Sequence, residues 1–134
     1  MSAAGPRAPD VLVVEDDPTT CELITELLMD QGYRVLQTGS GSVGLRLAKQ
    51  YHPETVVLDM MLGEVSGLDV LRELKAGLST SGIPVIVVSA YASLMGEQAA
   101  SQTAGVIQKP FDYDELVCRV ERVTEPSSVQ VALT

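Results

Sequence analysis

The sequence has few cysteines, few basic residues and no long apolar run. Its two cysteines, Cys21 and Cys118, lie far apart and lack the spacing of metal ligands, so neither a disulfide scaffold nor a zinc site is predicted. Acidic residues outnumber basic residues 18 to 9, which gives a formal net charge of -9. Direct nucleic-acid binding is therefore not expected, because it depends on basic clusters that meet phosphates.

Signals for export and for membrane insertion are also missing. Residues 1–9 have neither the charged start nor the long apolar core of a signal peptide. No uninterrupted apolar run approaches the roughly 20 residues that a membrane-spanning helix needs. We therefore expect a cytoplasmic protein without membrane association.

The composition is that of a single folded domain. The chain has 134 residues, of which 46% are hydrophobic and 20% charged, which suits one core and leaves no room for two ordinary domains. Residues 1–9, rich in Ala, Gly and Pro, are expected to form a flexible leader. We place the domain at residues 10–124 and expect residues 125–134 to form a tail or the start of a linker.

The stretch from Thr55 to Gly63 is the centre of the pattern. Apolar, largely β-branched residues end abruptly at Asp59, which predicts a strand that is buried on both faces and carries Asp59 to its C-terminal end. A buried carboxylate is unfavourable unless a cation or hydrogen bonds compensate it. Asp59 alone would also fit a helix cap, so its meaning depends on what the other strands bring to the same edge.

Apolar runs alternate with helical patterns along the chain. Strands are predicted at residues 10–14, 33–38, 55–59, 83–89 and 105–108. Helices are expected to begin near Pro18, at Ser40 or Ser42, after Ser66, near Ser93 and at Asp112. The first helix should turn Leu23, Ile24, Leu27 and Leu28 towards the core, and the fourth is poor in large apolar residues. The alternation predicts an α/β fold, a doubly wound parallel sheet with helices on both faces.

Polar residues follow four of these strands, at the carboxyl edge where parallel sheets bind ligands. They are Glu15-Asp16-Asp17, Asp59, Ser89 and Lys109. Two carboxylates about 4 Å apart repel by on the order of 4 kcal/mol at an effective dielectric of about 20, so a cation is expected. Oxygen ligands without His or Cys favour Mg²⁺. With Lys109 and Ser89 nearby, the set suits a phosphoryl group carried by Asp59.

These residues resemble the motifs of the receiver domain of two-component response regulators. The matching segments are Glu15-Asp16, Asp59, the turn from Leu62 to Gly67, Ser89-Ala90 and Lys109-Pro110-Phe111. Each segment is weak evidence alone, but all five occur in the order and spacing of the family. The resemblance covers about residues 10–124.

The resemblance implies a flavodoxin-like sheet of five strands in the order 2-1-3-4-5. It also implies a phosphoacceptor domain rather than a turnover enzyme, in which Asp59 takes a phosphoryl group from the phosphohistidine of a sensor histidine kinase or phosphotransfer protein. An output domain, an effector protein or a second copy of the chain would then respond.

The resemblance further assigns metal ligands around the phosphoacceptor. Asp16 and Asp59 would bind Mg²⁺ directly, and Glu15 would contribute through water. The backbone carbonyl of Met61 would be a further ligand.

Other positions of the family are matched in part. Ser89 and Lys109 would each hold a phosphoryl oxygen, and the bond between Lys109 and Pro110 would be cis. The position of the family's aromatic switch residue, however, is Val106 here. A swinging aromatic ring therefore cannot report on Ser89, and backbone shifts or another side chain, for which Tyr91 is a candidate, must carry the signal.

The sequence departs from the family pattern at two further places, and two positions near the site are ones at which family members vary. Gly63 replaces the proline of many relatives, which restrains the turn less, and the connection from Ala90 to Lys109 is slightly short for the family. Family members differ two positions beyond the phosphoacceptor and two beyond the serine, where this chain has Met61 and Tyr91. Neither is a good general base for water, so we expect a slowly decaying phosphoryl-aspartate.

Three other functions fit part of the pattern. A degenerate receiver would serve as a docking module without phosphorylation. A phosphohydrolase with an aspartyl nucleophile would usually carry a second acid where Met61 stands. A flavin- or nucleotide-binding module would need a Gly- or Ser/Thr-rich loop after the first strand, where this chain has three acids. Of these acids, Asp17 taken singly is expected to cap the helix that begins at Pro18.

Overall fold

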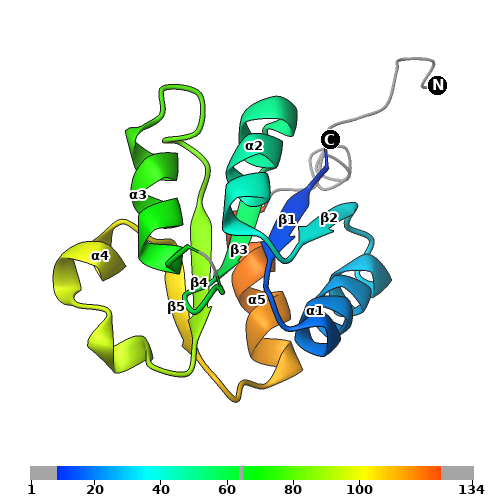
Figure 1. The fold of residues 1–134 in the computed structure, drawn as a ribbon. Coiled ribbons are helices and arrows are strands. Elements are labelled where there is room, and N and C mark those ends of the chain that lie inside the picture. Colours follow the sequence, from blue (N-terminus) through cyan, green and yellow to red (C-terminus); the bar gives the residue numbers. More distant parts are fainter. Residues whose placement is uncertain (1–8, 64, 125–134) are drawn as a thin grey trace.

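The computed structural model describes residues 9–63 and 65–124. Within them, five parallel strands form one sheet in the order β2-β1-β3-β4-β5 (Figure 1). The strands are β1 (Val11–Val14), β2 (Val35–Thr38), β3 (Thr55–Asp59), β4 (Val85–Ser89) and β5 (Gly105–Gln108). The helices are α1 (Pro18–Asp30), α2 (Gly41–Tyr51), α3 (Gly67–Ala76), α4 (Glu97–Ser101) and α5 (Tyr113–Val123), and a 3₁₀ turn, η1 (Ala92–Leu94), precedes α4. The predicted fold class and strand order are confirmed.

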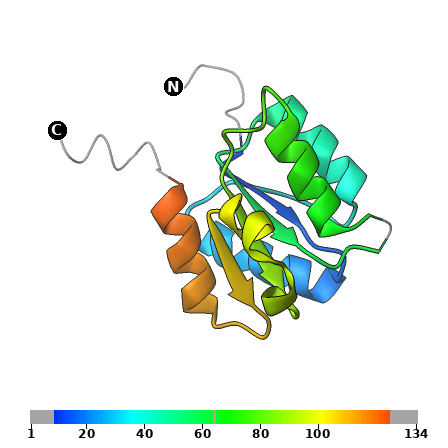
Figure 2. The same cartoon turned by 90° about the vertical axis from the view of Figure 1, so that its left-hand side faces the viewer.

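Helices cover both faces of the sheet. Two views at right angles show α1 and α5 on one side and α2 and α3 on the other (Figures 1 and 2). β1, β3 and β4 lie inside the sheet and all of their residues are buried. This double burial explains why their sequences are continuous apolar runs rather than alternating patterns.

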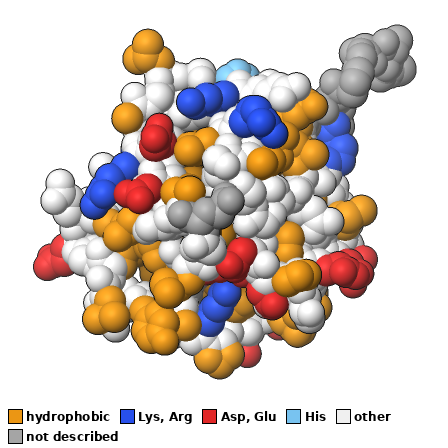
Figure 3. All heavy atoms as spheres, viewed as in Figure 1, with side chains coloured by type: hydrophobic (Ala, Val, Ile, Leu, Met, Phe, Trp, Pro, Cys, Tyr) orange, Lys and Arg blue, Asp and Glu red, His pale blue; other side chains and the backbone are white. Residues whose placement is uncertain are grey.

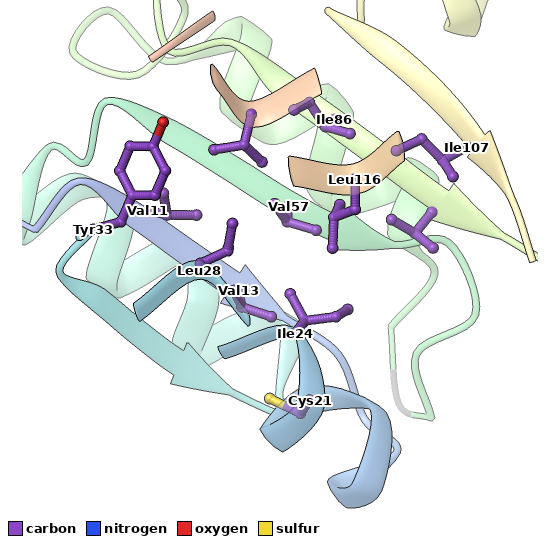
Figure 4. Packing of buried hydrophobic residues seen from close by; sticks show 12 residues of the cluster. Val11, Val13, Cys21, Ile24, Leu28, Tyr33, Val57, Ile86, Ile107 and Leu116 are labelled. Atoms are coloured by element: carbon purple, nitrogen blue, oxygen red, sulfur yellow. The ribbon is translucent and has the colours of Figure 1, made fainter. Parts of the chain in front are cut away.

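The core is divided by the sheet into two layers. On the side of α1 and α5, Val11, Val13 and Val57 of the strands pack with Ile24 and Leu28 of α1 (Figure 4). The residues between them on the same strands point to the opposite layer, as the two-residue period of a strand requires. Both layers together fix the strands, and therefore fix where their carboxyl ends lie.

The buried face of α1 differs in part from the expected one. Leu23 and Leu27 are only partly buried, and Cys21 and Thr25 are buried instead. The four buried positions, 21, 24, 25 and 28, follow the i, i+3, i+4, i+7 spacing of one helix face. Gln37 on the edge strand β2 pairs with the polar members of this face, because its Oε1 accepts hydrogen bonds from Thr25 Oγ1 (3.0 Å) and Cys21 Sγ (3.3 Å). A polar residue on the sheet thus allows Thr25 to be buried on this face, which a search for apolar residues alone misses.

Polar residues start the helices largely as predicted. Ser40, rather than Ser42, caps α2 by accepting a hydrogen bond from the backbone N–H of Val43 (3.2 Å). Ser66 caps α3 in the same way. Asp112 is the N-cap residue of α5, but its side chain accepts no capping hydrogen bond from the described residues.

The predicted fourth helix at about residues 93–102 is broken into two short pieces. Gly96, with φ of 90°, lies between η1 and α4, a backbone conformation that favours glycine. Met95 is the one large apolar side chain of this segment that is buried, and Leu94 is 79% exposed. A segment with so little to bury does not sustain a long helix.

The turn after β3 brings the chain back against the end of that strand. The N–H of Gly67 donates to the carbonyl of Met60 (2.9 Å), which closes the turn. A Cβ at Gly67 would lie 2.5 Å from both the carbonyl oxygen of Asp59 and the Cα of Met60. Gly67 therefore permits a backbone contact directly behind Asp59.

Residues 1–8, 64 and 125–134 lie outside the described residues, and with them most of the expected leader and the whole expected tail. The limits of the domain at both ends therefore stay predictions. None of the helices that the structure describes is long and apolar enough to cross a bilayer.

We predict that Gly67→Ala lowers the free energy of unfolding by about 2 kcal/mol, because the new methyl group meets backbone atoms that cannot rotate away. Urea unfolding followed by circular dichroism measures the change. Gly82→Ala is the matched control, since a Cβ there meets nothing within 4 Å, and it should change stability by less than about 0.5 kcal/mol. Equal effects of the two substitutions would contradict the close contact.

Candidate phosphoacceptor and metal site

Four strands deliver polar residues to one edge of the sheet. β1 runs into Glu15 and Asp16, β3 ends at Asp59, β4 ends at Ser89, and β5 runs into Lys109. Carboxylate oxygens of Glu15, Asp16 and Asp59 lie within 4.8 Å of one another. Figure 3 shows acidic and basic side chains together near the lower centre of the molecule, bordered by hydrophobic ones. The structure thus brings together three carboxylates from two separate strands.

Lys109 joins this cluster from the far edge of the sheet. Its Nζ lies 2.9 Å from Glu15 Oε1 and 3.6 Å from Asp59 Oδ1. Its backbone N–H donates to the carbonyl of Ser89 (2.8 Å), and its bond to Pro110 is cis, as expected. The ammonium group therefore bridges carboxylates that follow β1 and β3.

Burial changes the proton affinity of Glu15. The residue is 3% exposed, and its pKa is raised from 4.5 to about 7. Desolvation is the main cause, and the neighbouring Asp59 adds to it through a hydrogen bond and its charge, while Lys109 acts in the opposite direction. In the absence of a cation, the cluster therefore tends to retain one proton near neutral pH.

The same contacts act on Lys109. Burial by itself lowers the pKa of the ammonium group, but the hydrogen bond to Glu15 and the charges of Glu15 and Asp59 outweigh burial. The pKa of Lys109 is consequently raised above its ordinary value. Lys109 is therefore a permanent positive charge at this edge.

Asp59 is held in place by its own turn. The side chain is 4% exposed, and its Oδ1 accepts a hydrogen bond from the backbone N–H of Met61 (3.1 Å). The N–H of Met60 donates to the carbonyl of Val88 (3.2 Å), which continues the pairing of β3 with β4. The Met61 side chain is 57% exposed, and the role of its carbonyl as a metal ligand stays a prediction.

Ser89 lies on the neighbouring strand, one position beyond the residue paired with Asp59. Its side chain is buried, and Oγ accepts a hydrogen bond from the backbone N–H of Tyr91 (3.0 Å). Within residues 9–63 and 65–124, the hydroxyl makes no hydrogen bond to Asp59. Ser89 is thus brought to the site but is engaged with the loop that follows it.

Asp17 is not part of the carboxylate cluster. Its Oδ2 accepts a hydrogen bond from the backbone N–H of Thr20 (3.0 Å) at the start of α1. Hydrogen bonds from the hydroxyl and the backbone of Thr20 lower the pKa of Asp17. Asp17 is therefore the N-cap residue of α1, as the sequence predicts for this aspartate when it is considered singly.

A shallow hollow of about 340 Å³ lies beside Ser89 and the first two residues after Asp59. Its lining is mostly apolar and consists of Met60, Met61, Ser66, Leu68, Ser89, Tyr91, Leu94 and Met95. The sequence analysis did not identify this hollow, because its walls come from separate segments of the chain. It also missed Gln108, whose side chain contacts the loop after Ser89. The sequence did contain a signal for Gln108, because it is the last residue of β5 and β5 pairs with β4, which ends at Ser89.

The charges of the cluster suit a divalent cation. Three carboxylates face one ammonium group, so two negative charges remain uncompensated when all are ionised. Mg²⁺ binds oxygen ligands from one or two carboxylates together with phosphate oxygens. The residues present therefore fit a magnesium site.

The chain matches the response regulator receiver domain family over residues 11–121. It is 33% identical over 132 residues to the probable transcriptional regulatory protein TcrX of Mycobacterium tuberculosis, an alignment that covers 96% of this chain and 55% of TcrX. It is also 34% identical over 110 residues to the polar-differentiation response regulator DivK of Brucella ovis, covering 80% of this chain and 89% of DivK. The chain therefore spans about half the length of TcrX and most of DivK.

A solved structure agrees with these sequence matches. The response regulator TrrA of Thermotoga maritima, crystallised in complex with Mg(2+)-BeF, superimposes with a TM-score of 0.77 and 26% identity. The match covers 84% of this chain and 96% of TrrA. Fold, strand order and sequence thus point to the same family.

The raised pKa of Glu15 generates a pH prediction for the protein in a metal chelator. Between pH 4.5 and about 7 the folded protein keeps a proton that the unfolded chain has lost. Stability contributed by that proton is fully present below pH 4.5 and is lost as the pH rises through about 7. Relative to Glu15→Gln, which cannot titrate, the wild type should lose up to about 3 kcal/mol over this range.

Urea unfolding at a series of pH values measures this difference. Glu22→Gln is the control, because it removes an exposed negative charge from the neighbouring α1. Parallel stability curves for the wild type and Glu15→Gln would contradict the raised pKa of Glu15.

Proposed function

Because the chain belongs to the response regulator receiver domain family, we propose that Asp59 accepts a phosphoryl group from a phosphohistidine. The observation that carries this proposal is the buried Asp59 beside Glu15, Asp16 and Lys109. An Asp59 oxygen would form the new bond to phosphorus as the bond from phosphorus to the donor histidine breaks. The histidine nitrogen would leave with the bonding electron pair.

Glu15, Asp16 and Asp59 would hold Mg²⁺, with the backbone carbonyl of Met61 as a further ligand. When bound, the ion neutralises carboxylate charge and the charge of the phosphoryl oxygens. The excess of negative charge at this edge supports the assignment. TrrA, a receiver of the same fold, was crystallised with Mg(2+)-BeF.

Lys109 and Ser89 would hold the transferred group. Lys109 Nζ already lies 3.6 Å from Asp59 Oδ1, so a small movement would place it on a phosphoryl oxygen. Ser89 offers a hydroxyl donor from the adjacent strand. Both groups would stabilise negative charge on the phosphoryl oxygens rather than transfer protons.

The proposed partners follow from this chemistry. A sensor histidine kinase or a phosphotransfer protein would supply the phosphoryl group in the cytoplasm. An output domain, an effector protein or a second copy of the chain would respond to the phosphorylated form. Val106 carries no aromatic ring that could swing between two positions, so the response would pass through the backbone or another side chain.

We predict that incubation with Mg²⁺ and acetyl phosphate adds the mass of one phosphoryl group to the intact protein. Asp59→Asn should abolish this gain, because an amide is not a nucleophile for phosphorus. Asp17→Asn should retain it, since the Asp17 side chain caps α1 outside the carboxylate cluster, and its backbone N–H, which donates to Glu15, is unchanged by the substitution. Intact mass spectrometry measures the gain.

Two results would contradict this proposal. A wild-type protein that never gains mass would indicate a docking module without phosphorylation. Continuous release of phosphate from a phosphomonoester would indicate the hydrolase. Loss of the mass gain in Asp17→Asn as well would show that the measurement responds to general damage at this edge.

We also predict that Met61→Asn speeds the loss of the phosphoryl group. Met61 is exposed beside Asp59 and cannot orient a water molecule, whereas a carboxamide can. An increase of at least about threefold in the decay rate is expected, since positioned groups of this kind commonly contribute more. The decay is followed by mass spectrometry after the phosphodonor is removed.

The matched control for this experiment is Met29→Asn. Met29 on α1 is 57% exposed, the same fraction as Met61, and it lies outside the site. Its substitution should leave the decay rate unchanged. Unchanged or slower decay in Met61→Asn would overturn the prediction.

A further inference from the structure

Gln108 makes an unusual set of contacts for an exposed side chain. It is the last residue of β5 and the direct register partner of Ser89, the last residue of β4. Its Nε2 donates to the carbonyl oxygens of Ala90 (2.6 Å) and Lys109 (3.0 Å). Its Oε1 accepts from the backbone N–H of Ala92 (3.2 Å). One amide therefore uses both its donor and its acceptor groups on backbone.

These contacts continue the sheet beyond the point where β4 ends. The last backbone bond between β4 and β5 runs from the N–H of Lys109 to the carbonyl of Ser89 (2.8 Å). Past this bond, the side chain of Gln108 replaces the missing strand by pairing with Ala90 and Ala92. Residues 90–92 are thereby tied to the strand that also carries Lys109.

The tied segment contacts the Ser89 hydroxyl directly. Tyr91 lies between the two residues that Gln108 holds, and its N–H donates to Ser89 Oγ (3.0 Å). A serine hydroxyl has one donor and two acceptor positions. Since Tyr91 occupies an acceptor position, the proton of the hydroxyl stays available as a donor to a ligand at the site.

We propose that Gln108 is a positioning residue, which orders residues 90–92 and so presents the Ser89 hydroxyl to a phosphoryl oxygen on Asp59. This inference rests on the proposed function of Asp59. Gln108 itself touches neither Asp59 nor Lys109 Nζ among its hydrogen bonds in the described part of the chain. It acts through Tyr91 and Ser89.

Chemistry explains why the residue is an amide. A glutamate at position 108 would have nearly the same shape, but a carboxylate is only an acceptor and would meet the carbonyls of Ala90 and Lys109 without a proton to share. A methionine would lose all three contacts while keeping the length of the side chain. The two substitutions therefore remove the contacts in different ways.

Beryllofluoride, formed from beryllium chloride and sodium fluoride in the presence of Mg²⁺, is the probe for the phosphoryl group. We expect Gln108→Glu and Gln108→Met to weaken its binding about tenfold, as the loss of one or two ordinary hydrogen bonds would. The affinity for Mg²⁺ alone should stay within twofold of the wild type, because Gln108 does not contact the carboxylates. Binding is measured by NMR titration.

Gln102→Glu is the matched control. Gln102 is exposed at the end of α4, its side chain makes no hydrogen bond in the described residues, and the substitution adds the same charge. It should leave beryllofluoride binding unchanged. If Gln102→Glu weakens binding as much as Gln108→Glu, charge rather than the Gln108 contacts is responsible and the proposal fails. Tighter binding in either Gln108 variant would also overturn it.

A double-mutant cycle separates positioning from general stability. If Gln108 acts through the Ser89 hydroxyl, then Gln108→Met should have less than a twofold effect on beryllofluoride binding in a Ser89→Ala background. A merely structural role would give the same loss in both backgrounds. Equal losses would therefore overturn the proposal.

Amide hydrogen exchange tests the ordered loop without any phosphoryl analogue. In the wild type, the N–H groups of Tyr91 and Ala92 should be protected, and Gln108→Met should reduce both protection factors about tenfold. Unprotected amides in the wild type would overturn the proposal even if beryllofluoride binds. The wild type could also bind no beryllofluoride while both amides are protected. That result would overturn the proposed function of Asp59 and the proposed positioning role of Gln108. It would still establish that residues 90–92 are ordered.

Discussion

The position of Lys109 between Glu15 and Asp59 is the interaction on which this edge of the molecule depends. Both carboxylates are almost fully buried, and neither could be desolvated beside the other without a positive charge nearby. A single ammonium group compensates only part of their charge, and Asp16 adds a third carboxylate. The folded chain thus carries a local excess of negative charge that either a proton on Glu15 or a bound cation relieves.

That requirement explains features of the fold that lie far apart in the sequence. Glu15 and Lys109 are 94 residues apart and meet only because β1, β3, β4 and β5 are parallel and end at one edge. The register fixes the height of each group, since Asp59 is paired with Val88 and Ser89 with Gln108. Gly67 then lets the chain turn back directly behind Asp59. A shift of one residue in any of these pairings would turn a charged group towards the core.

Sequence patterns predicted the parts of this structure that depend on hydrophobic burial. β3 and β5 have the predicted limits because apolar runs end there at polar residues. The patterns missed contacts that depend on a hydrogen bond between two segments. Gln37 binds Thr25 on the buried face of α1, and Gln108 binds the backbone of the segment that follows Ser89. Such pairs join residues that only the register of the sheet brings together, and the periodicity of one segment does not contain that information.

Val106 stands where the family resemblance leads us to expect an aromatic switch residue, so a swinging ring is not available to follow a movement of Ser89. Residues 106 and 108 are two positions apart on β5, so their side chains point to the same face of the sheet. On this face, Gln108 contacts Ala92, the first residue of η1. An aromatic ring would move into the space that Ser89 leaves. The amide of Gln108 instead depends on the positions of the backbone groups to which it is hydrogen-bonded. A displacement of Ser89 that carries Ala90 and Ala92 with it would strain their hydrogen bonds to Gln108, and these two residues flank the exposed Tyr91. The contacts between Ser89 and the exposed Tyr91 therefore include directional hydrogen bonds, which weaken steeply when donor and acceptor move out of line, in addition to the apolar packing of the hollow beside Ser89.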